Sequence, residues 1–450
     1  MREIVNVNIG QAGVKIGEAL WKLLCLEHGV SCDGTWSQET TCGAYDNPEC
    51  VFYGANGKFF PRAVFVDSEP DAIDALRKSP NGASRRIFNP SFLISGSESA
   101  ANNFAWGRYR TGPDILESTL HEIRRMVERC DSFQGFIFSR SISGGTGSGF
   151  AALLLEHLYS EYQQKSRLEF ALFPSPNISS IPVEPYNAVL STQSTLPTID
   201  CTFVLDNEAV YNLLRANLRR GAEVDDESVN LLIAQAISST TLALRASCGQ
   251  NMDIGDFSTN LVPSRKLHFP GLSFAPVVGP GKVLTCVKTM TRELLESKAD
   301  LVSWDPRDGR CIACCLLYRG PSQPVDVQQS ITKIKGLKQT TTASWCPPAF
   351  KVGHVPAPPI YPEQSVFGEI SDALSMLSAN TAVKGIFKRM TRKFDLLFSK
   401  RAFVHSYLCE GMSINDIRDA FEDVEDLIFE YQKQEEDMSD ESFSSNTDGI

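Results

Sequence analysis

Two glycine-rich turns are the residues of this sequence best suited to hold an anion: Gly10-Gln11-Ala12-Gly13 and Ser143-Gly144-Gly145-Thr146-Gly147-Ser148-Gly149. Glycines let consecutive amides turn toward one anion, and a helix beginning at the turn adds the positive end of its dipole. The second motif lacks the Lys followed by Ser or Thr of a Walker loop, so amides and hydroxyls would hold the phosphates. Taken alone, such a run is as compatible with a flexible linker as with a phosphate loop.

A pair of acids, Asp253 and Asp256, is the second chemical candidate. At positions i and i+3 of a helix, two carboxylates share one face. Together they could orient a water molecule or accept its proton, which is worth roughly 10²–10⁴ in rate. An Asp-x-x-Asp pattern equally resembles a capping arrangement at a helix start. The residues alone do not separate these two interpretations.

The elements that would position the glycine turns follow an alternating pattern. Residues 3–9 alternate apolar and polar as a strand does, break at Gly10 and continue into helical spacing over 11–28. Further strand-like runs are at 63–66, 135–142, 168–173 and 201–205, and a helix is expected at 150–162. This alternation predicts an α/β fold with a mostly parallel sheet, whose ligands lie beyond the carboxyl ends of the strands. The second glycine motif falls there, which favours phosphate binding over a linker.

The rest of the chain divides into four further parts. A largely apolar helix at 228–244 should be buried between subdomains. From about 260 the texture is β-rich (267–278, 310–318, 349–353), and helical patterns return at 373–390 and 414–431. We therefore predict a nucleotide-binding domain at 1–206, a linking segment with the core helix at 207–259, a mixed α+β domain at 260–382, C-terminal helices at 383–434 and an acidic disordered tail at 435–450.

Composition excludes several classes of protein. A chain of 450 residues is too long for one compact core, and neither a signal peptide nor a run of roughly 20 apolar residues is present, so we expect a soluble intracellular protein without a membrane partner. Residues 416–450 hold 13 acids and two bases, and the remainder is neutral overall. We expect no nucleic-acid binding, and basic partners at the acidic C-terminus. A basic run at 384–401 is interleaved with Phe residues and is interpreted as the solvated face of an amphipathic helix.

The 13 cysteines do not predict disulfides or a metal site. Cys311-x-x-Cys314-Cys315 has no second Cys or His pair at matching spacing, so reduced thiols in a buried strand are expected.

The two glycine turns, together with other blocks along the chain, resemble the tubulin family. These blocks are 25–29, 61–67, 100–103, 183–187, 206–209, 259–263, 313–320 and 400–405. The resemblance covers about residues 1–431, and the blocks at 25–29 and 313–320 are closer to α- than to β-tubulin. It implies an α-tubulin-like GTPase with GTP or GDP and Mg²⁺ as cofactors. It further implies head-to-tail assembly with a β-tubulin-like partner and with longitudinal and lateral neighbours, in the cytoplasmic cytoskeleton.

The resemblance also implies a role for each matching residue. The phosphates would be cradled by Gly10, Gln11, Ala12, Ser143, Gly144, Gly145, Thr146 and Gly147. Glu69 would act on magnesium through water with Asp67 nearby, Asn102 would touch the γ-phosphate end, and Ser179 and Glu184 would contact the sugar. Asn207 and Asn230 would read the guanine edge, since amide side chains present both donors and acceptors. Asp253 and Asp256 would project onto the neighbouring subunit's nucleotide, which favours the catalytic interpretation of this pair.

Several positions depart from the family pattern. Ser143 replaces the first loop glycine, Ser99 replaces an aspartate near the γ-phosphate, and Asp226 occupies the place of a tyrosine that stacks on guanine. Asp256 is one methylene shorter than the usual glutamate, segment 278–290 keeps little of the lateral-contact pattern, and loop 31–57 has no lysine. Ser99 and Asp226 suggest an alternative, a structural or capping subunit that retains GTP without hydrolysing it. A dinucleotide oxidoreductase is disfavoured, because Gly-x-Gly-x-x-Gly is absent after the first strand.

Overall fold

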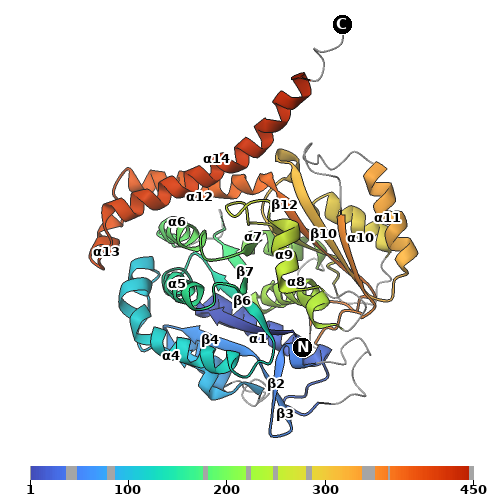
Figure 1. Ribbon diagram of the computed structural model, residues 1–450, viewed down its shortest axis with the longest axis horizontal. Coiled ribbons are helices and arrows are strands. Elements are labelled where there is room, and N and C mark those ends of the chain that lie inside the picture. Colours follow the sequence, from blue (N-terminus) through green and yellow to red (C-terminus); the bar gives the residue numbers. More distant parts are fainter. Residues whose placement is uncertain are drawn as a thin grey trace.

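One ten-stranded sheet runs through the molecule, in the order β11-β10-β12-β9-β8-β7-β6-β1-β4-β5 (Figure 1). The computed structural model describes residues 2–36, 48–78, 87–175, 181–218, 224–246, 252–279, 286–336, 350–362 and 365–444. The amino-terminal strands are parallel: β1 (Glu3–Ile9), β4 (Ala63–Asp67), β5 (Leu93–Ser95), β6 (Phe133–Ser141), β7 (Ser166–Phe173) and β8 (Cys201–Asp206). The predicted α/β class with a mostly parallel sheet is confirmed.

The second half extends the same sheet and makes it mixed. β9 (Gly271–Ala275) runs parallel to β8, and β12 (Ala373–Asn380) lies antiparallel between β9 and β10 (Cys311–Arg319). β11 (Phe350–Val355) is parallel to β10 and forms one edge. A separate hairpin is made by β2 (Phe52–Ala55) and β3 (Lys58–Pro61). The mixed half therefore shares its sheet with the parallel half.

Helices cover both faces of the sheet (Figure 1). On β1, Val5 and Val7 pack in one cluster with residues of α4 and α5, whereas Ile4 packs in another with residues of α1 and α8. The helices are α1 (Gly10–Glu27), α2 (Pro70–Lys78), α4 (Thr111–Val127), α5 (Ala151–Glu161), α6 (Glu184–Thr195), α7 (Asn207–Asn217), α8 (Asp226–Arg245), α9 (Ile254–Leu261), α10 (Val287–Leu295), α11 (Pro324–Gly336), α12 (Lys384–Phe398), α13 (Val404–Leu408) and α14 (Ile414–Ser444). Short 3-10 or π turns are η3 (Pro48–Cys50), η4 (Pro90–Phe92), η5 (Trp106–Arg110), η6 (Thr146–Phe150), η7 (Pro306–Asp308) and η8 (Thr381–Val383).

The apolar helix α8 is buried between the two halves, as its composition predicts. Nearly all of its residues from Ser228 onward are buried. It packs against α1 on one side and contacts β9, β10, β11 and β12 on the other. A helix that is apolar nearly all round has no face left for solvent, and this position gives each face a partner.

The predicted helix at 373–390 is wrong over its first half. Residues 373–380 form β12, every residue of which is buried, and the helix α12 begins only at Lys384. A strand with both faces covered shows no alternation of apolar and polar residues: Ala373 and Leu377 pack in one cluster, and Leu374 and Met376 pack in another. Periodicity alone cannot tell such a run from a buried helix. Asn380 ends the strand, and its side chain accepts the amide of Ala382 to start η8.

The C-terminal helix also extends further than expected. α14 continues to Ser444, whereas the sequence led us to end the helices at 434. The added segment, residues 435–444, begins with Glu435 and Glu436 and also contains Met438 and Glu441, and Glu and Met are good helix formers. Figure 1 shows this end of α14 leading away from the rest of the molecule.

The thiols predicted on a buried strand lie on β10 and are free. Cys314 and Cys315 are buried, and burial raises the pKa of the Cys315 thiol to about 12. Within the described ranges, no group of three or more His, Cys, Asp or Glu is arranged to hold a metal ion. Nor does any helix in those ranges have the length and apolar character needed to cross a membrane.

Candidate functional site

A cavity of about 200 Å³ lies at the carboxyl end of the parallel strands, where the glycine turns were predicted to gather. Its wall combines the end of β1, the first turn of α1, the residues after β4 and the loop after β6. Ten predicted residues line it: Gly10, Gln11, Ala12, Glu69, Asn102, Ser143, Gly144, Gly145, Thr146 and Gly147. The structure therefore brings together, from four segments, the residues expected at the phosphates.

The two glycine turns touch each other, and three glycines make the contact possible. Gly10 has a φ of +72°, and a Cβ placed on it would lie 3.2 Å from the amide nitrogen of Gly147. A Cβ on Gly13 would lie 2.2 Å from the carbonyl oxygen of Ser139, so α1 can start directly against β6 only with glycine there. These close approaches explain why both turns are glycine-rich independently of any ligand.

The helices that begin at the cavity have no side-chain cap among the described residues. Ile9 precedes α1 and Gly145 precedes η6, and neither residue can cap with its side chain. The first amides of a helix have no intrahelical acceptor, so they can serve an anion. The second motif is not a simple turn as predicted, because residues 146–150 form a π turn that leads into α5.

Acids and hydroxyls occupy one side of the cavity. Burial raises the pKa of Asp67 to about 6, and Ser68 Oγ lies 2.6 Å from the hydroxyl of Thr146. Ser99, at the position where the family pattern has an aspartate, donates its hydroxyl to Oε1 of Glu69. Among the described lining residues there is no Lys, Arg or His. The cavity therefore presents amides, hydroxyls and carboxylates, but no cationic side chain.

Asn187, a buried residue of α6 that the sequence analysis quoted only as part of a block, holds two of the cavity's loops in place. Its Nδ2 donates to the carbonyl oxygens of Asn102, at 2.7 Å, and Ser143, at 2.8 Å. Its Oδ1 accepts the amide of Phe104 at 3.0 Å and the hydroxyl of Tyr407 at 2.7 Å. Every hydrogen-bonding position of the side chain is used, so this amide fixes the distance between the Asn102 and Ser143 turns.

A second residue beneath the cavity, Arg140, had no role in the sequence analysis. It is the next-to-last residue of β6, and its side chain is only 1% exposed. A sequence signal for it exists, because the arginine ends the otherwise apolar run of residues 136–138 and precedes the glycine motif by three residues. A charge at a buried position of a strand requires a partner.

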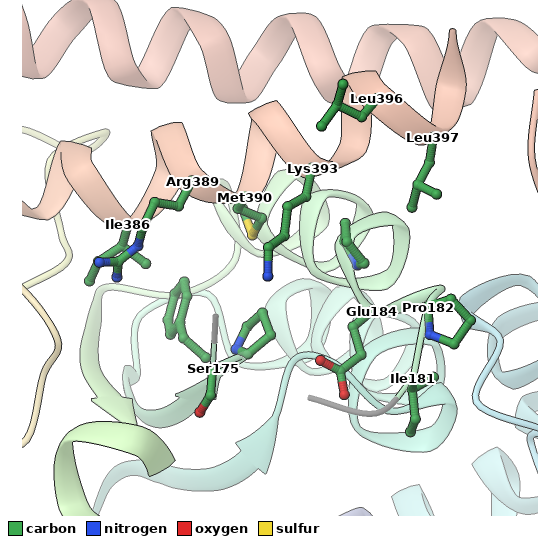
Figure 2. A pocket seen from close by; sticks show the side chains of 13 residues that line it. Ser175, Ile181, Pro182, Glu184, Ile386, Arg389, Met390, Lys393, Leu396 and Leu397 are labelled. Atoms are coloured by element: carbon green, nitrogen blue, oxygen red, sulfur yellow. The ribbon is translucent and has the colours of Figure 1, made fainter. Parts of the chain in front are cut away.

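Of the residues predicted for the sugar and base, Glu184, Asn207 and Asn230 do not line the cavity. Glu184 begins α6 and lines a neighbouring groove of about 480 Å³, which shares Ile181 with the cavity. Figure 2 shows Glu184 and Ile181 on the side of this groove that faces α12, with Arg389 and Lys393 across from them. Ser179, the other sugar candidate, lies outside the described residues.

The two guanine candidates occupy neighbouring helices. Asn207 begins α7 directly after β8, and Asn230 lies one turn into α8. Tyr211, one turn after Asn207, donates its hydroxyl to Asp226, one turn before Asn230. Residues four apart share a helix face, so this bond brings the Asn207 and Asn230 faces toward each other. Asp226, which departs from the family pattern, is thus engaged by a tyrosine of the facing helix.

The acid pair lies near the amino-terminal ends of the parallel strands, whereas the cavity lies at their carboxyl ends. Asp253 Oδ1 is 2.7 Å from Nη1 of Arg2, the residue before β1, and Asp256 Oδ2 is 3.8 Å from Nζ of Lys351 at the start of β11. Asp256 also accepts the amide of Asp253 at 3.0 Å, which is the capping arrangement at the start of α9. Both carboxylates are about two-fifths exposed. Within one chain, the structure does not bring this pair to the phosphate residues.

An α/β sheet with an amide-lined, glycine-built cavity at its carboxyl edge defines a phosphate-binding fold. Residues 3–215 match the model of the GTPase domain of the tubulin/FtsZ family, and residues 265–392 match the tubulin C-terminal domain. The tubulin alpha-2 chain of Schizosaccharomyces pombe is 42% identical over 97% of this chain and 98% of its own length. The tubulin alpha-1 chain of Saccharomyces cerevisiae is 43% identical, and the tubulin alpha chain of Eremothecium gossypii is 44% identical, each over 96% of this chain and 97% of its own.

The chain belongs to the tubulin family. It is an α-tubulin-like GTP-binding subunit of the cytoplasmic cytoskeleton, with the GTPase activity of that family and with tubulin partners in filaments. The alternative of a non-hydrolysing capping subunit is not favoured by these similarities.

Proposed function

We propose that the cavity holds the phosphates of GTP together with Mg²⁺, and that Asp253 and Asp256 serve the nucleotide of the next chain in a head-to-tail filament. The observation that carries the proposal is that the cavity and the acid pair lie at opposite ends of the strands of one sheet.

The cavity's charge supports a bound cation. A triphosphate placed among Asp67 and Glu69 would add negative charge to a wall whose described residues include no cationic side chain. Mg²⁺ binds phosphate and carboxylate oxygens while keeping several waters, so it suits this donor set. Glu69, held by Ser99, would contact it through water, and the ion would neutralise charge on the phosphates. Glu69 and Asp67 are the residues of this chain that would hold it.

The cavity accommodates only part of a nucleotide. Its volume of about 200 Å³ is below the roughly 300–1,000 Å³ of typical small-molecule sites. The amides of 144–147 and the turn at 10–12 would bind the phosphates. The sugar and base would extend toward Glu184, Ser179, Asn207 and Asn230, where a carboxylate can accept ribose hydroxyls and two amides can read guanine.

The distance along the strands would keep Asp256 out of reach of a nucleotide bound in its own chain's cavity. β1 leads from Arg2, which contacts Asp253, to Ile9, which lines the cavity. Seven residues at roughly 3.3 Å each put about 20 Å between these ends. A carboxylate must come within hydrogen-bond reach of the water that it orients. Only a second molecule stacked along the strand direction would bring an acid pair to the cavity.

A β-tubulin-like chain is the proposed partner at this interface, since the α-tubulin chains named above match this chain over nearly their whole length. The acids along α14, among them Asp419, Glu422 and Asp426, form an exposed surface that suits basic filament-binding proteins.

Asp256→Asn separates the catalytic interpretation from the capping one. An asparagine can still accept the amide of Asp253 through Oδ1, so the start of α9 keeps its cap, whereas it cannot take a proton from water. We expect the variant, copolymerised with a β-tubulin-like partner, to retain GTP and assemble, and to release phosphate roughly 10²–10⁴ times more slowly. Asp256→Ala is the matched variant that removes both roles and should also lower the unfolding temperature.

Assembly-dependent phosphate release, followed with a coupled optical assay beside sedimentation, gives the measurement. Wild-type release rates for Asp256→Asn would assign the acid to helix capping alone. Purified wild-type protein that holds no guanine nucleotide would reject the proposed site altogether.

A further inference from the structure

We infer that Arg140 is a positioning residue of the phosphate loop: its buried guanidinium holds the peptide at Gly147 with the carbonyl directed away from the phosphates. The inference rests on the proposed function, because it assigns a role in the same cavity. It concerns a residue beneath the cavity that does not line it.

Arg140 lies at the centre of the sheet, directly under the loop. In the register of the strands it pairs with Ile9 of β1 and with Ala171 of β7. Three residues separate it from Gly144, so the phosphate loop begins immediately after it. The backbone at Arg140 also lies against the first helix, because a Cβ on Gly13 would be 3.4 Å from its Cα. Both glycine turns therefore rest on this position.

The guanidinium joins three elements. Its Nε donates to Oε1 of Glu169 on β7, and its Nη1 donates to the carbonyl oxygen of Gly147 and to Oγ of Ser191 on α6, each at 2.7 Å. Glu169 is held in turn by the hydroxyl of Thr202 at 3.1 Å. The planar fork of arginine suits such divergent acceptors better than the point charge of lysine. One side chain thus ties the phosphate loop to α6, the helix that Glu184 begins.

The contact to Gly147 reinforces the direction of a glycine peptide in the π turn η6. Glycine reaches conformations closed to other residues, so a peptide in this loop can turn its carbonyl toward the cavity or away from it. A carbonyl oxygen facing a phosphate would repel it, whereas an amide attracts it. A charge-assisted hydrogen bond to Gly147 keeps the carbonyl on the protein side. The preference is built into the chain before any nucleotide binds.

The structure offers a matched control in a second buried ion pair. Arg62 and Glu3 are each 4% exposed and lie 2.7 Å apart, as deeply buried as Arg140 and Glu169. This pair is at the opposite end of β1, where Glu3 is the first residue. Removing either pair should cost similar stability, but only one pair contacts the phosphate loop.

The test compares the double variants R140Q/E169Q and R62Q/E3Q in the full chain, in the assembly in which it is isolated. The release rate of bound GTP is measured by exchange with a fluorescent analogue, and the unfolding temperature is measured beside it. We expect both variants to unfold at similarly lowered temperatures. GTP release from R140Q/E169Q should be roughly 10- to 100-fold faster, the effect of losing one charge-assisted hydrogen bond, with release from R62Q/E3Q within about threefold of wild type.

Arg140→Lys keeps the inference testable if the double variant does not fold. A lysine has a single nitrogen, which can still pair with Glu169 but cannot at the same time occupy the position from which Nη1 of the arginine contacts Gly147 and Ser191. We therefore expect release several-fold faster than wild type, with little change in unfolding temperature. Wild-type release from Arg140→Lys, or equal release from the two double variants, would overturn the inference. Wild-type protein without bound nucleotide would instead reject the site itself.

Discussion

Glu27 offers the sharpest test of how the nucleotide half is joined to the mixed half. This residue ends α1, whose first turn lines the cavity, and its carboxylate is fully buried. Nη2 of Arg319, on β10, donates to Oε1 at 2.7 Å, and Nη1 of Arg245, at the end of α8, donates to Oε2 at 3.0 Å. The hydroxyl of Ser238 lies within 2.8 Å of both oxygens. One carboxylate therefore joins α1, α8 and β10.

The size of the effect follows from the pKa of the carboxyl group. Burial alone would raise the pKa of Glu27, but the guanidiniums of Arg319 and Arg245 and the Ser238 hydroxyl outweigh it and hold the pKa at about 2, against 4.5 in an unfolded chain. A difference of roughly 2.5 units corresponds to about 3 kcal/mol of stability at neutral pH. Breaking a buried ion pair by removing one partner costs a similar roughly 3–5 kcal/mol.

Glu27→Gln is therefore expected to lose about 3 kcal/mol of unfolding free energy at pH 7. Because the folded pKa is lowered, this stabilisation is present above about pH 4.5 and is lost as the pH falls toward 2. The difference between wild type and variant should thus shrink by about 1 kcal/mol between pH 7 and pH 3.5. Urea unfolding followed by tryptophan fluorescence at both pH values measures it.

A control and a refuting result complete the test. Glu156, 42% exposed and 2.8 Å from Arg108, is a surface partner, and Glu156→Gln should cost at most about 1 kcal/mol at pH 7. A Glu27→Gln variant whose deficit stays below 1 kcal/mol, or does not change with pH, would refute the assignment of the carboxylate as the charged centre of this junction.

Two further predictions concern single positions. A Cβ on Gly145 would lie 2.7 Å from the carbonyl oxygen of Ala100, so Gly145→Ala should cost about 1–3 kcal/mol of unfolding free energy in thermal unfolding. A Cβ on Gly144 would have nothing within 4 Å, so Gly144→Ala should change the unfolding free energy by less than about 0.5 kcal/mol. Equal losses in the two variants would contradict this packing. Burial raises the pKa of Asp300 to about 6, so its ionisation costs the folded state at higher pH and the cost fades as the pH falls toward 4. Asp300→Asn should therefore gain about 1 kcal/mol relative to wild type between pH 5 and pH 8, and a gain independent of pH in urea unfolding would contradict it.

The parts of the fold that local sequence determines were predictable. β1 and β6 each end in a glycine turn that starts a helix, and the signals for strand, turn and helix lie within a few residues of one another. β12 was not predictable in this way, because both of its faces are buried and its hydrogen-bonding partners, β9 and β10, are distant in sequence. The identity of those neighbours, rather than any property of residues 373–380, makes them a strand.

For the candidate site, the residues that line the cavity were predictable from sequence, but the residues behind them were not. Residues that face the cavity are carried on recognisable motifs. Asn187 and Arg140 instead act from behind, through side-chain and backbone partners 29 to 220 positions away or through the nearby peptide at Gly147. The two roles of Asp256 could not be separated from sequence, since the same spacing serves a helix cap and a shared face. The structure shows the cap and also the sheet edge on which the pair lies.

The junction between β8 and β9 has a mechanical consequence. Val204 with Gly271 is the one residue pair in register between these two strands, and β8 is otherwise joined to the segment before β9 by the amides of Thr202 and Val204, which donate to the carbonyls of His268 and Pro270. α8 contacts α1 on one side of this junction and β9, β10, β11 and β12 on the other. We therefore expect α8 to resist bending between the two halves. Because it packs against both, a shift or rotation of α8 would change the packing of both halves.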